Sequence, residues 1–249
     1  MLILSIDSSG MTASAALVTE EKILAEMSVN NKKTHSQTLL PMVEQLMDSV
    51  DLSPEAVDMI AIAEGPGSFT GLRIGAALAK GLGLALEKPL IGISTTDALA
   101  YGYGVTDCLI CPMIDARHET VYTGIYAWQG GCFMTLIDTE AVSLRELAEQ
   151  VADLHPDPGT AVIVCGDGAQ GYQDSFDSYL REVYTERGQE PEERPELKLA
   201  PVHLRLQRAA ALGALALQRT ETATPADDFA PDYHRMTQAE RMKKLRENQ

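Results

Sequence analysis

The chain has 249 residues, 45% of them hydrophobic, which is enough to bury a sizeable core as one large domain or as two lobes. Its 36 acidic and 20 basic side chains give a formal net charge of −16, spread over both halves. Such a surface repels phosphate backbones and argues against tight binding of nucleic acid by the chain alone. There is no internal repeat, no apolar run long enough to span a membrane and no charged-then-apolar leader, so we expect a cytoplasmic protein.

The first predicted elements are three strands followed by a helix. Residues 2–6 form an apolar run that ends at Asp7-Ser-Ser-Gly10, and a strand-like pattern resumes over residues 12–18, which indicates a hairpin. A third strand is predicted over residues 22–29. From 36 to 50 the apolar residues recur with the spacing of an amphipathic helix.

A buried strand over residues 57–63 leads into the segment Ala63-Glu-Gly-Pro-Gly-Ser-Phe-Thr-Gly-Leu-Arg-Ile-Gly75, which opens a helix rich in small residues. One interpretation is that its glycines shape a loop whose amides bind a phosphate. The other is that the small residues let the helix lie close to the sheet or to a partner subunit. The glycine spacing matches neither a Walker loop nor the dinucleotide fingerprint, which favours the second interpretation.

The second half repeats the mixture of strands and helices. Strands are predicted over residues 90–93, 108–116, 120–128, 133–137 and 161–165, and helices over 94–101, 143–154 and 202–219. Residues 185–198 are predicted to be a long exposed loop. The simplest fold is α/β with two lobes, an N-terminal lobe over 1–105 that carries the glycine loop and the interface helices, and a C-terminal lobe over 106–249. The helix over 201–219 is free to pack back on the first lobe.

Several polar residues stand where catalysis or binding would need them. Asp7, at the end of the first strand, is either a ligand-contacting carboxylate or a turn former, and the second interpretation is favoured. His35 has no second ligand three or four residues later, so it is predicted to cap the helix or contact a partner rather than bind metal. Ser68 fails the nucleophile-elbow spacing because Gly67 adjoins it directly.

The cysteine spacing Cys108-Leu-Ile-Cys111 suggests a zinc or redox site, but it lies within an apolar strand, where side chains three apart point to opposite faces. No second pair of this kind follows. We therefore expect ordinary buried thiols and no metal site.

Taken together, six sets of residues resemble the TsaB (YeaZ) family over essentially the whole chain. They are Ile6-Asp-Ser-Ser9, His35-Ser-Gln-Thr-Leu-Leu-Pro41, Gly65-Pro-Gly-Ser-Phe-Thr-Gly-Leu-Arg-Ile-Gly75 with Lys80-Gly81, Ile93-Ser94 with Ala98-Leu-Ala100, Asp115-Ala-Arg117, and Pro231-Asp-Tyr-His-Arg235. The chain departs from the family pattern at Tyr233-His234-Arg235, where Tyr-Leu-Arg is expected.

This resemblance implies a two-lobed actin-like, sugar-kinase-like (ASKHA) fold and a role in making threonylcarbamoyladenosine (t6A) in tRNA, next to the anticodon. It implies a non-catalytic paralogue of the TsaD transferase that binds and activates TsaD together with the TsaE ATPase. The family also implies a homodimer when the chain is alone, contact with tRNA only through the complex, and no tightly bound cofactor. Whether ATP or ADP lodges at the interface of the complex is left open.

Carried over to this sequence, the resemblance implies a partner interface on the first long helix and on the glycine segment with its helix. The interface residues are His35, Ser36, Leu39, Gly67, Ser68, Phe69, Thr70, Leu72, Arg73, Gly75, Ala76 and Ala79, of which the last three would permit tight packing between subunits. Asp7, Ser8 and Ser9 are the residues that would lie near a nucleotide.

Three hypotheses remain open from the sequence. The leading one is a scaffold that assembles with TsaD. The second is an enzyme, either a nucleotide-hydrolysing member of the actin-like class or a peptidase of the glycoprotease grouping, which Asp7→Ala or Ser68→Ala would inactivate. The third is a free-standing homodimeric binding protein.

Overall fold

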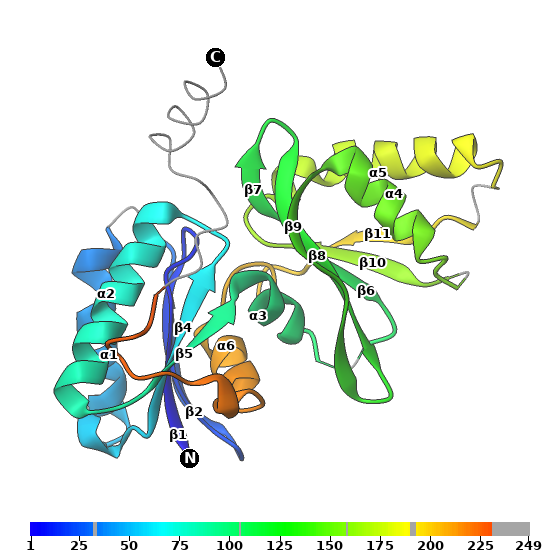
Figure 1. Cartoon of the computed structure of the whole chain (residues 1–249). Helices are drawn as coiled ribbons and strands as arrows, with labels where there is room; N and C mark the ends of the chain where they lie inside the picture. The colour runs from blue at the N-terminus through cyan, green and yellow to red at the C-terminus, as the bar shows by residue number, and fades with distance from the viewer. Residues whose placement is uncertain (32–33, 105, 158, 190–192, 231–249) are drawn as a thin grey trace.

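The computed structural model describes residues 1–31, 34–104, 106–157, 159–189 and 193–230. The predicted lobe boundary at residue 105 and the motif Pro231-Asp-Tyr-His-Arg235 lie outside the described residues. The described chain forms two α/β lobes, each with its own sheet (Figure 1). This confirms the predicted α/β class and two-lobed architecture, while the division at residue 105 stays a prediction.

The sheet of the first lobe has the strand order β3-β2-β1-β4-β5. Its strands are β1 (Leu2–Asp7), β2 (Ala13–Thr19), β3 (Ile23–Val29), β4 (Met59–Gly65) and β5 (Leu90–Ser94). The predicted hairpin is confirmed, because β1 pairs antiparallel with β2, whereas β1, β4 and β5 run parallel. The carboxyl ends of β1 and β4 therefore lie at one end of the sheet, which is where the turn after β1 meets the glycine segment after β4.

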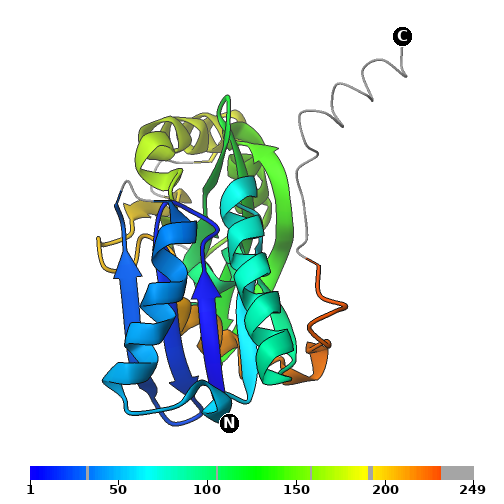
Figure 2. The ribbon, with the colours of Figure 1, turned by 90° about the vertical axis from the view of Figure 1, so that its left-hand side faces the viewer.

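Helices cover both faces of this first sheet (Figures 1 and 2). On one face are α1 (His35–Ser49) and α2 (Phe69–Leu86), and on the other are α3 (Thr95–Tyr101) and α6 (Ala209–Ala216). Because side chains alternate along a strand, Leu4 and Ile6 join the core under α1 and α2. Ser5 points the other way, and its hydroxyl donates to the carbonyl oxygen of Ala209 at 2.7 Å.

The helix predicted over residues 202–219 is shorter than expected, since α6 begins only at Ala209. Tertiary contacts compete with helix formation in the preceding residues. The Gly166 amide donates to the carbonyl oxygen of Arg205 at 2.6 Å, and the Arg205 side chain donates to the carbonyl oxygen of Ala200 at 3.0 Å. Residues 202–206 form turns instead.

The second sheet has the order β11-β10-β6-β8-β7, with β9 paired to β8. Its strands are β6 (Leu109–Pro112), β7 (Ile114–Arg117), β8 (Thr120–Gln129), β9 (Cys132–Ser143), β10 (Ala161–Cys165) and β11 (Glu196–Leu199). The helices α4 (Leu144–Asp153) and α5 (Ala169–Glu186) pack on it. The predicted capping box is present, since the Ser143 amide donates to the Glu146 carboxylate at 2.7 Å and the Glu146 amide to the Ser143 hydroxyl at 3.2 Å.

The exposed loop predicted over residues 185–198 is wrong at both ends. The helix α5 runs to Glu186, because Val183 and Tyr184 in its last turns are buried in the second core. At the other end β11 pairs with β10 from Glu196 onward. Residues 190–192 lie outside the described part of the chain.

A buried polar network joins the two lobes. The hydroxyl of Tyr126, on β8, donates to the Asp97 carboxylate in the first turn of α3 at 2.8 Å. It also lies 3.0 Å from the hydroxyl of Thr139 on β9. The other oxygen of Asp97 accepts from Arg219, which follows α6, at 2.7 Å. These bonds fix the orientation of α3 against the second sheet.

Candidate functional site

The candidate site is the junction between the turn after β1 and the glycine segment after β4. The Ser68 amide donates to the carbonyl oxygen of Ser9 at 2.6 Å, and the Ser8 hydroxyl donates to the carbonyl oxygen of Gly71 at 2.9 Å. A Cβ atom at Gly67 would collide with the Ser9 carbonyl oxygen, and one at Gly71 with that of Ser8. Both glycines are therefore required by the close approach of backbone to backbone.

The start of α2 is satisfied by groups of the chain itself. Ser68 is the N-cap, and its hydroxyl accepts from the Gly71 amide at 3.3 Å. Two amides that a phosphate would need are thus already bonded, and the carbonyl oxygens of Ser8 and Ser9 present negative partial charge to the same loop. The geometry favours the close-packing interpretation of the glycine segment over the phosphate-binding one.

Asp7 is engaged inside this junction. Its side chain is 1% exposed, and one carboxylate oxygen accepts from the Ser9 amide at 2.8 Å and from the Ser9 hydroxyl at 2.6 Å. Burial raises the pKa of the Asp7 carboxyl above its ordinary value, although the two bonds from Ser9 oppose that rise. The structure brings Asp7, Ser8 and Ser9 together, but each of them is buried and bonded within the chain.

Two further side chains close the turn after β1. His35, the first residue of α1, lies with its Nε2 2.9 Å from the carbonyl oxygen of Gly10, so this nitrogen donates. The amide group of Gln207 lies against Gly10 from the segment before α6, and it is 2% exposed. A Cβ atom at Gly10 would lie 2.6 Å from the Gln207 nitrogen. The turn is therefore enclosed by α1, α2 and the segment that leads into α6.

Part of the predicted interface reaches the surface. Ser36, Ser68, Thr70 and Arg73 are exposed at the beginning of the two helices. The Arg73 guanidinium carbon lies 3.9 Å from the centre of the half-buried Phe69 ring, a cation–π contact that holds both side chains at this end of α2.

The other part of the predicted interface lies inside the lobe, and for these five residues the interface stays a prediction. Leu39, Leu72, Gly75, Ala76 and Ala79 are buried beneath the helices. The small residues of α2 let it approach β1 and β4, since a Cβ atom at Gly75 would collide with the Ser8 hydroxyl and lie 3.0 Å from Ile62. Within the chain they pack the helix on its own sheet.

Apolar residues that are exposed on these helices were not among the predicted interface residues. Leu40 of α1 is 43% exposed and Leu84 of α2 is 51% exposed, and Ala77 and Gly81 are also at the surface. The helices lie side by side with their outer sides turned away from the sheet (Figure 2). We call this outer surface of α1 and α2 the helical face. The available signal was Leu40 itself, an apolar residue directly beside the core position Leu39.

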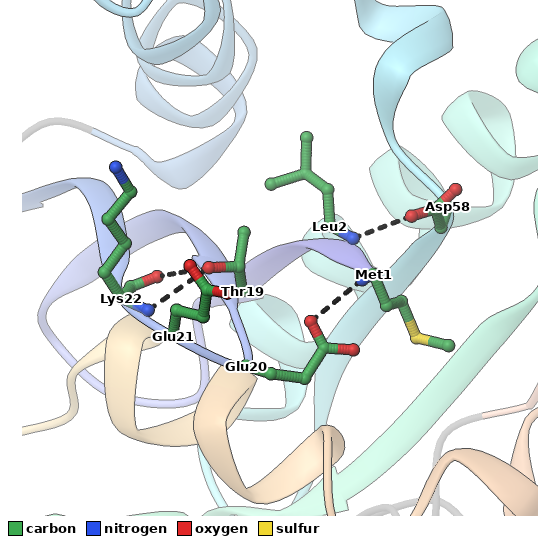
Figure 3. Close-up of a pocket in the computed structure, with 7 residues that line it drawn as sticks. All are labelled: Met1, Leu2, Thr19, Glu20, Glu21, Lys22 and Asp58. Atoms are coloured by element: carbon green, nitrogen blue, oxygen red, sulfur yellow. Dashed lines mark hydrogen bonds and ion pairs between the residues drawn. The ribbon is translucent and has the colours of Figure 1, made fainter.

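A hollow of about 600 Å³ lies at the opposite end of the first sheet (Figure 3). The residues that line it are Met1, Leu2, Thr19, Glu20, Glu21, Lys22 and Asp58. The Met1 ammonium pairs with Glu20 at 2.8 Å, and the Leu2 amide donates to Asp58 at 2.7 Å. These bonds anchor the start of β1, and the Thr19 hydroxyl is bonded to the backbone of Lys22.

Metal-binding groups are scattered. Within the described residues, no group of three or more His, Cys, Asp or Glu side chains is placed to hold a metal ion. The four cysteines are free thiols; Cys111 and Cys165 are buried as expected, whereas Cys132 is exposed at the β8–β9 hairpin.

Most of the chain matches the model of a known protein family. The family model of TsaD, described as tRNA N6-adenosine threonylcarbamoyltransferase, matches residues 22–241. Together with the two-sheet architecture, this match confirms the predicted actin-like (ASKHA) fold class.

Individual relatives are also similar to the chain. The tRNA threonylcarbamoyladenosine biosynthesis protein TsaB of Bacillus subtilis (strain 168) is 37% identical over 153 residues, which are 61% of this chain and 67% of that protein. TsaB of Escherichia coli (strain K12) is 35% identical over 154 residues, 60% of this chain and 65% of that protein. A solved structure of a Pseudomonas aeruginosa protein with similarity to peptidase YeaZ is 27% identical, with a TM-score of 0.70, and covers 94% of this chain and 99% of that one.

Proposed function

We propose, because the chain belongs to the TsaB (YeaZ) family of tRNA threonylcarbamoyladenosine biosynthesis proteins, that it is a non-catalytic scaffold subunit. In this proposal it binds and activates a TsaD-type transferase, together with a TsaE-type ATPase, for t6A formation next to the anticodon. A cytoplasmic location belongs to the same proposal, since the partners would work there. Contact with tRNA would be made through the complex, because the chain carries a net charge of −16.

The observation that carries the non-catalytic part is the closed junction between β1 and α2. In an enzyme of this fold a phosphate would need free amides and a carboxylate at the ends of the strands. Here the Ser68 amide is bonded to Ser9, and the Asp7 carboxylate is bonded to the amide and hydroxyl of Ser9. These contacts support a role in holding two loops together, and we propose no tightly bound cofactor for the isolated chain. A nucleotide at the interface of the assembled complex would then have to be held mainly by the partner.

The helical face supports the scaffold part of the proposal. Leu40 and Leu84 expose apolar surface there, and Arg73 adds a charged group at one end. Apolar side chains surrounded by polar ones are typical of protein–protein contacts. We propose that the transferase binds this face, and that a second copy of the chain occupies it when the transferase is absent.

The enzyme hypotheses receive no support from a specific contact. The Ser68 hydroxyl caps α2 by accepting a hydrogen bond from the Gly71 amide. A catalytic serine would instead bond to a base such as histidine, and no histidine is among the groups bonded to Ser68. We therefore keep the scaffold as the proposed function.

Analytical ultracentrifugation of the chain with the TsaD-type transferase tests this proposal. We expect a one-to-one complex for the wild type and its loss for Leu84→Glu, which replaces an exposed apolar side chain in the last turn of α2 by a charge. Val202→Glu is the matched control, because Val202 is 83% exposed and belongs to neither α1 nor α2. Failure of the wild-type chain to bind the transferase would contradict the proposal.

A further inference from the structure

Residues 201–208 join β11 of the second lobe to α6 of the first (Figure 1). They form turns and extended chain rather than a helix or strand. In the second lobe, the carbonyl oxygen of Arg205 accepts from the Gly166 amide, which follows β10, at 2.6 Å. In the first lobe, the Arg208 guanidinium pairs with Glu26 on β3. The connection is thus anchored in each lobe.

Gln207 lies between these two anchors and is turned inward. It is 2% exposed, and a Cβ atom at Gly10 would lie 2.6 Å from its side-chain nitrogen. Two residues further on, the carbonyl oxygen of Ala209 accepts from the Ser5 hydroxyl on β1 at 2.7 Å. Because side chains two apart along a strand share a face, Asp7 lies on the same face of β1 as Ser5. Gln207 therefore covers the end of this face.

Several polar atoms at this covered place are unpaired. Among the described residues, neither the nitrogen nor the oxygen of the Gln207 side chain has a hydrogen-bond partner. The buried hydroxyls of Thr12 and Ser14 likewise have none within the described chain. Ser14 lies opposite Asp7 in the β1–β2 hairpin and so shares the covered face. Buried polar groups are normally paired, and each unpaired one lowers the stability of the arrangement that buries it.

The same connection is also loosely packed on its apolar side. A hollow of about 240 Å³ lies beside it, lined by Leu204, Leu206 and Arg208 together with residues of α3, α6 and the start of β3. Both leucines are half-buried and line this hollow. Segments with few buried apolar contacts are those that open locally before the rest of a protein unfolds.

We propose that residues 204–208 form a latch over the turn after β1, which opens locally while both lobes stay folded. Opening gives water access to the side chains of Gln207, Thr12 and Ser14, which offsets the loss of the anchoring contacts. The end of β1 is where an α/β fold meets its ligands, so the closed latch keeps solutes away from Asp7 in the isolated chain.

Native-state hydrogen exchange of the full chain, followed for single amides by NMR, tests the latch. Two amides make hydrogen bonds of the same length, 2.6 Å: Gly166 donates to Arg205 of the latch, whereas Met113 donates to Cys165 within the second lobe. We expect the Gly166 amide to be less protected than the Met113 amide by about 30-fold or more. Low concentrations of urea should change the exchange of Gly166 little, because a local opening exposes little surface.

Three variants separate the causes. Gln207→Met keeps the length of the side chain and removes the unpaired amide, so it should raise the protection of Gly166 about fivefold or more and raise the melting temperature. Gln129→Met is the matched control, because Gln129 is exposed at the end of β8, and it should leave that protection within about twofold of the wild type. Arg208→Ala removes one anchor and should lower the protection of Gly166 about two- to fivefold.

Two results would overturn the latch. Equal protection of Gly166 and Met113 in the wild type would mean that the connection opens only when the whole chain unfolds. A lower melting temperature in Gln207→Met would mean that the Gln207 amide is hydrogen-bonded in solution. The first comparison needs no variant, and all the measurements use the isolated chain, so their outcome is separate from binding of the transferase.

Discussion

The backbone amide of Ser68 donates a hydrogen bond of 2.6 Å to the carbonyl oxygen of Ser9. This bond joins the start of α2 to the turn after β1, two loops that in an α/β fold usually face a ligand. Gly67 and Gly71 make it possible, because any larger residue would meet the Ser8 and Ser9 carbonyl groups. The glycine segment therefore serves the packing of the first lobe.

The first prediction concerns two glycines of the same helix. Gly71→Ala should destabilise the chain by about 1–3 kcal/mol, because its Cβ would collide with the backbone of Ser8. Gly81→Ala is the control. Nothing lies within 4 Å of a Cβ at Gly81, so this change should stabilise the helix by about 0.5–1 kcal/mol. Urea unfolding measures both, and equal effects would show that the close approach at Gly71 is unimportant.

The second prediction concerns the buried carboxyl of Asp7. Burial raises its pKa in the folded chain above the ordinary value of 3.8. The folded state therefore holds more protons than the unfolded state between these two values, and stability falls as pH rises through that interval. In Asp7→Asn this part of the pH dependence should vanish, since the amide oxygen can still accept from Ser9. Asp7→Ala should be less stable than Asp7→Asn, because it leaves the Ser9 donors without their acceptor. An unchanged pH profile in Asp7→Asn would contradict the assignment.

A third prediction tests the strain in the β7–β8 turn. Glu119→Gly should stabilise the chain by about 0.5–1 kcal/mol, because glycine adopts the φ of 54° without a steric cost. Glu119→Ala removes the same carboxylate and keeps the strain, so it should bring no gain. Thermal unfolding compares the two variants. A loss of stability in Glu119→Gly would mean that the turn is relaxed in the native chain.

The fourth prediction concerns the network between the lobes. Tyr126→Phe removes a buried hydroxyl that bonds to Asp97 and lies against Thr139, and should cost about 1–3 kcal/mol. Hydrogen exchange should become faster in α3 and in the middle of β8. If hydrogen exchange in Tyr126→Phe stayed at the wild-type rate, other contacts would be holding the lobes in place.

Much of the first lobe could be predicted from the sequence, because its signals are local. The turn at Asp7-Ser-Ser-Gly10 marks the hairpin, and the spacing of apolar residues after His35 marks α1. The second lobe was less predictable. The helix α5 carries many polar residues and was not predicted, and β11 follows a segment rich in Pro and Glu that resembles a loop.

The candidate site shows where local patterns stop being informative. The row of small residues at Gly75, Ala76 and Ala79 predicts a close approach, but the same pattern fits a sheet of the same chain and a second subunit. Only the fold shows that β1 and β4 occupy that face. The positive φ angles of Arg117, His118 and Glu119 had no local signal, because these residues lack the Asn and Gly that mark such turns.

Threonylcarbamoylation of tRNA in a reconstituted system tests the scaffold role most directly. The system contains the TsaD-type transferase, the TsaE-type ATPase, the adenylate-forming enzyme, ATP, threonine and bicarbonate, with or without this chain. We predict that modification collapses when the chain is omitted, is restored by the wild type and by Val202→Glu, and is not restored by Leu84→Glu. Undiminished modification without the chain would contradict the account, and the isolated chain would then have to be tested for nucleotide hydrolysis.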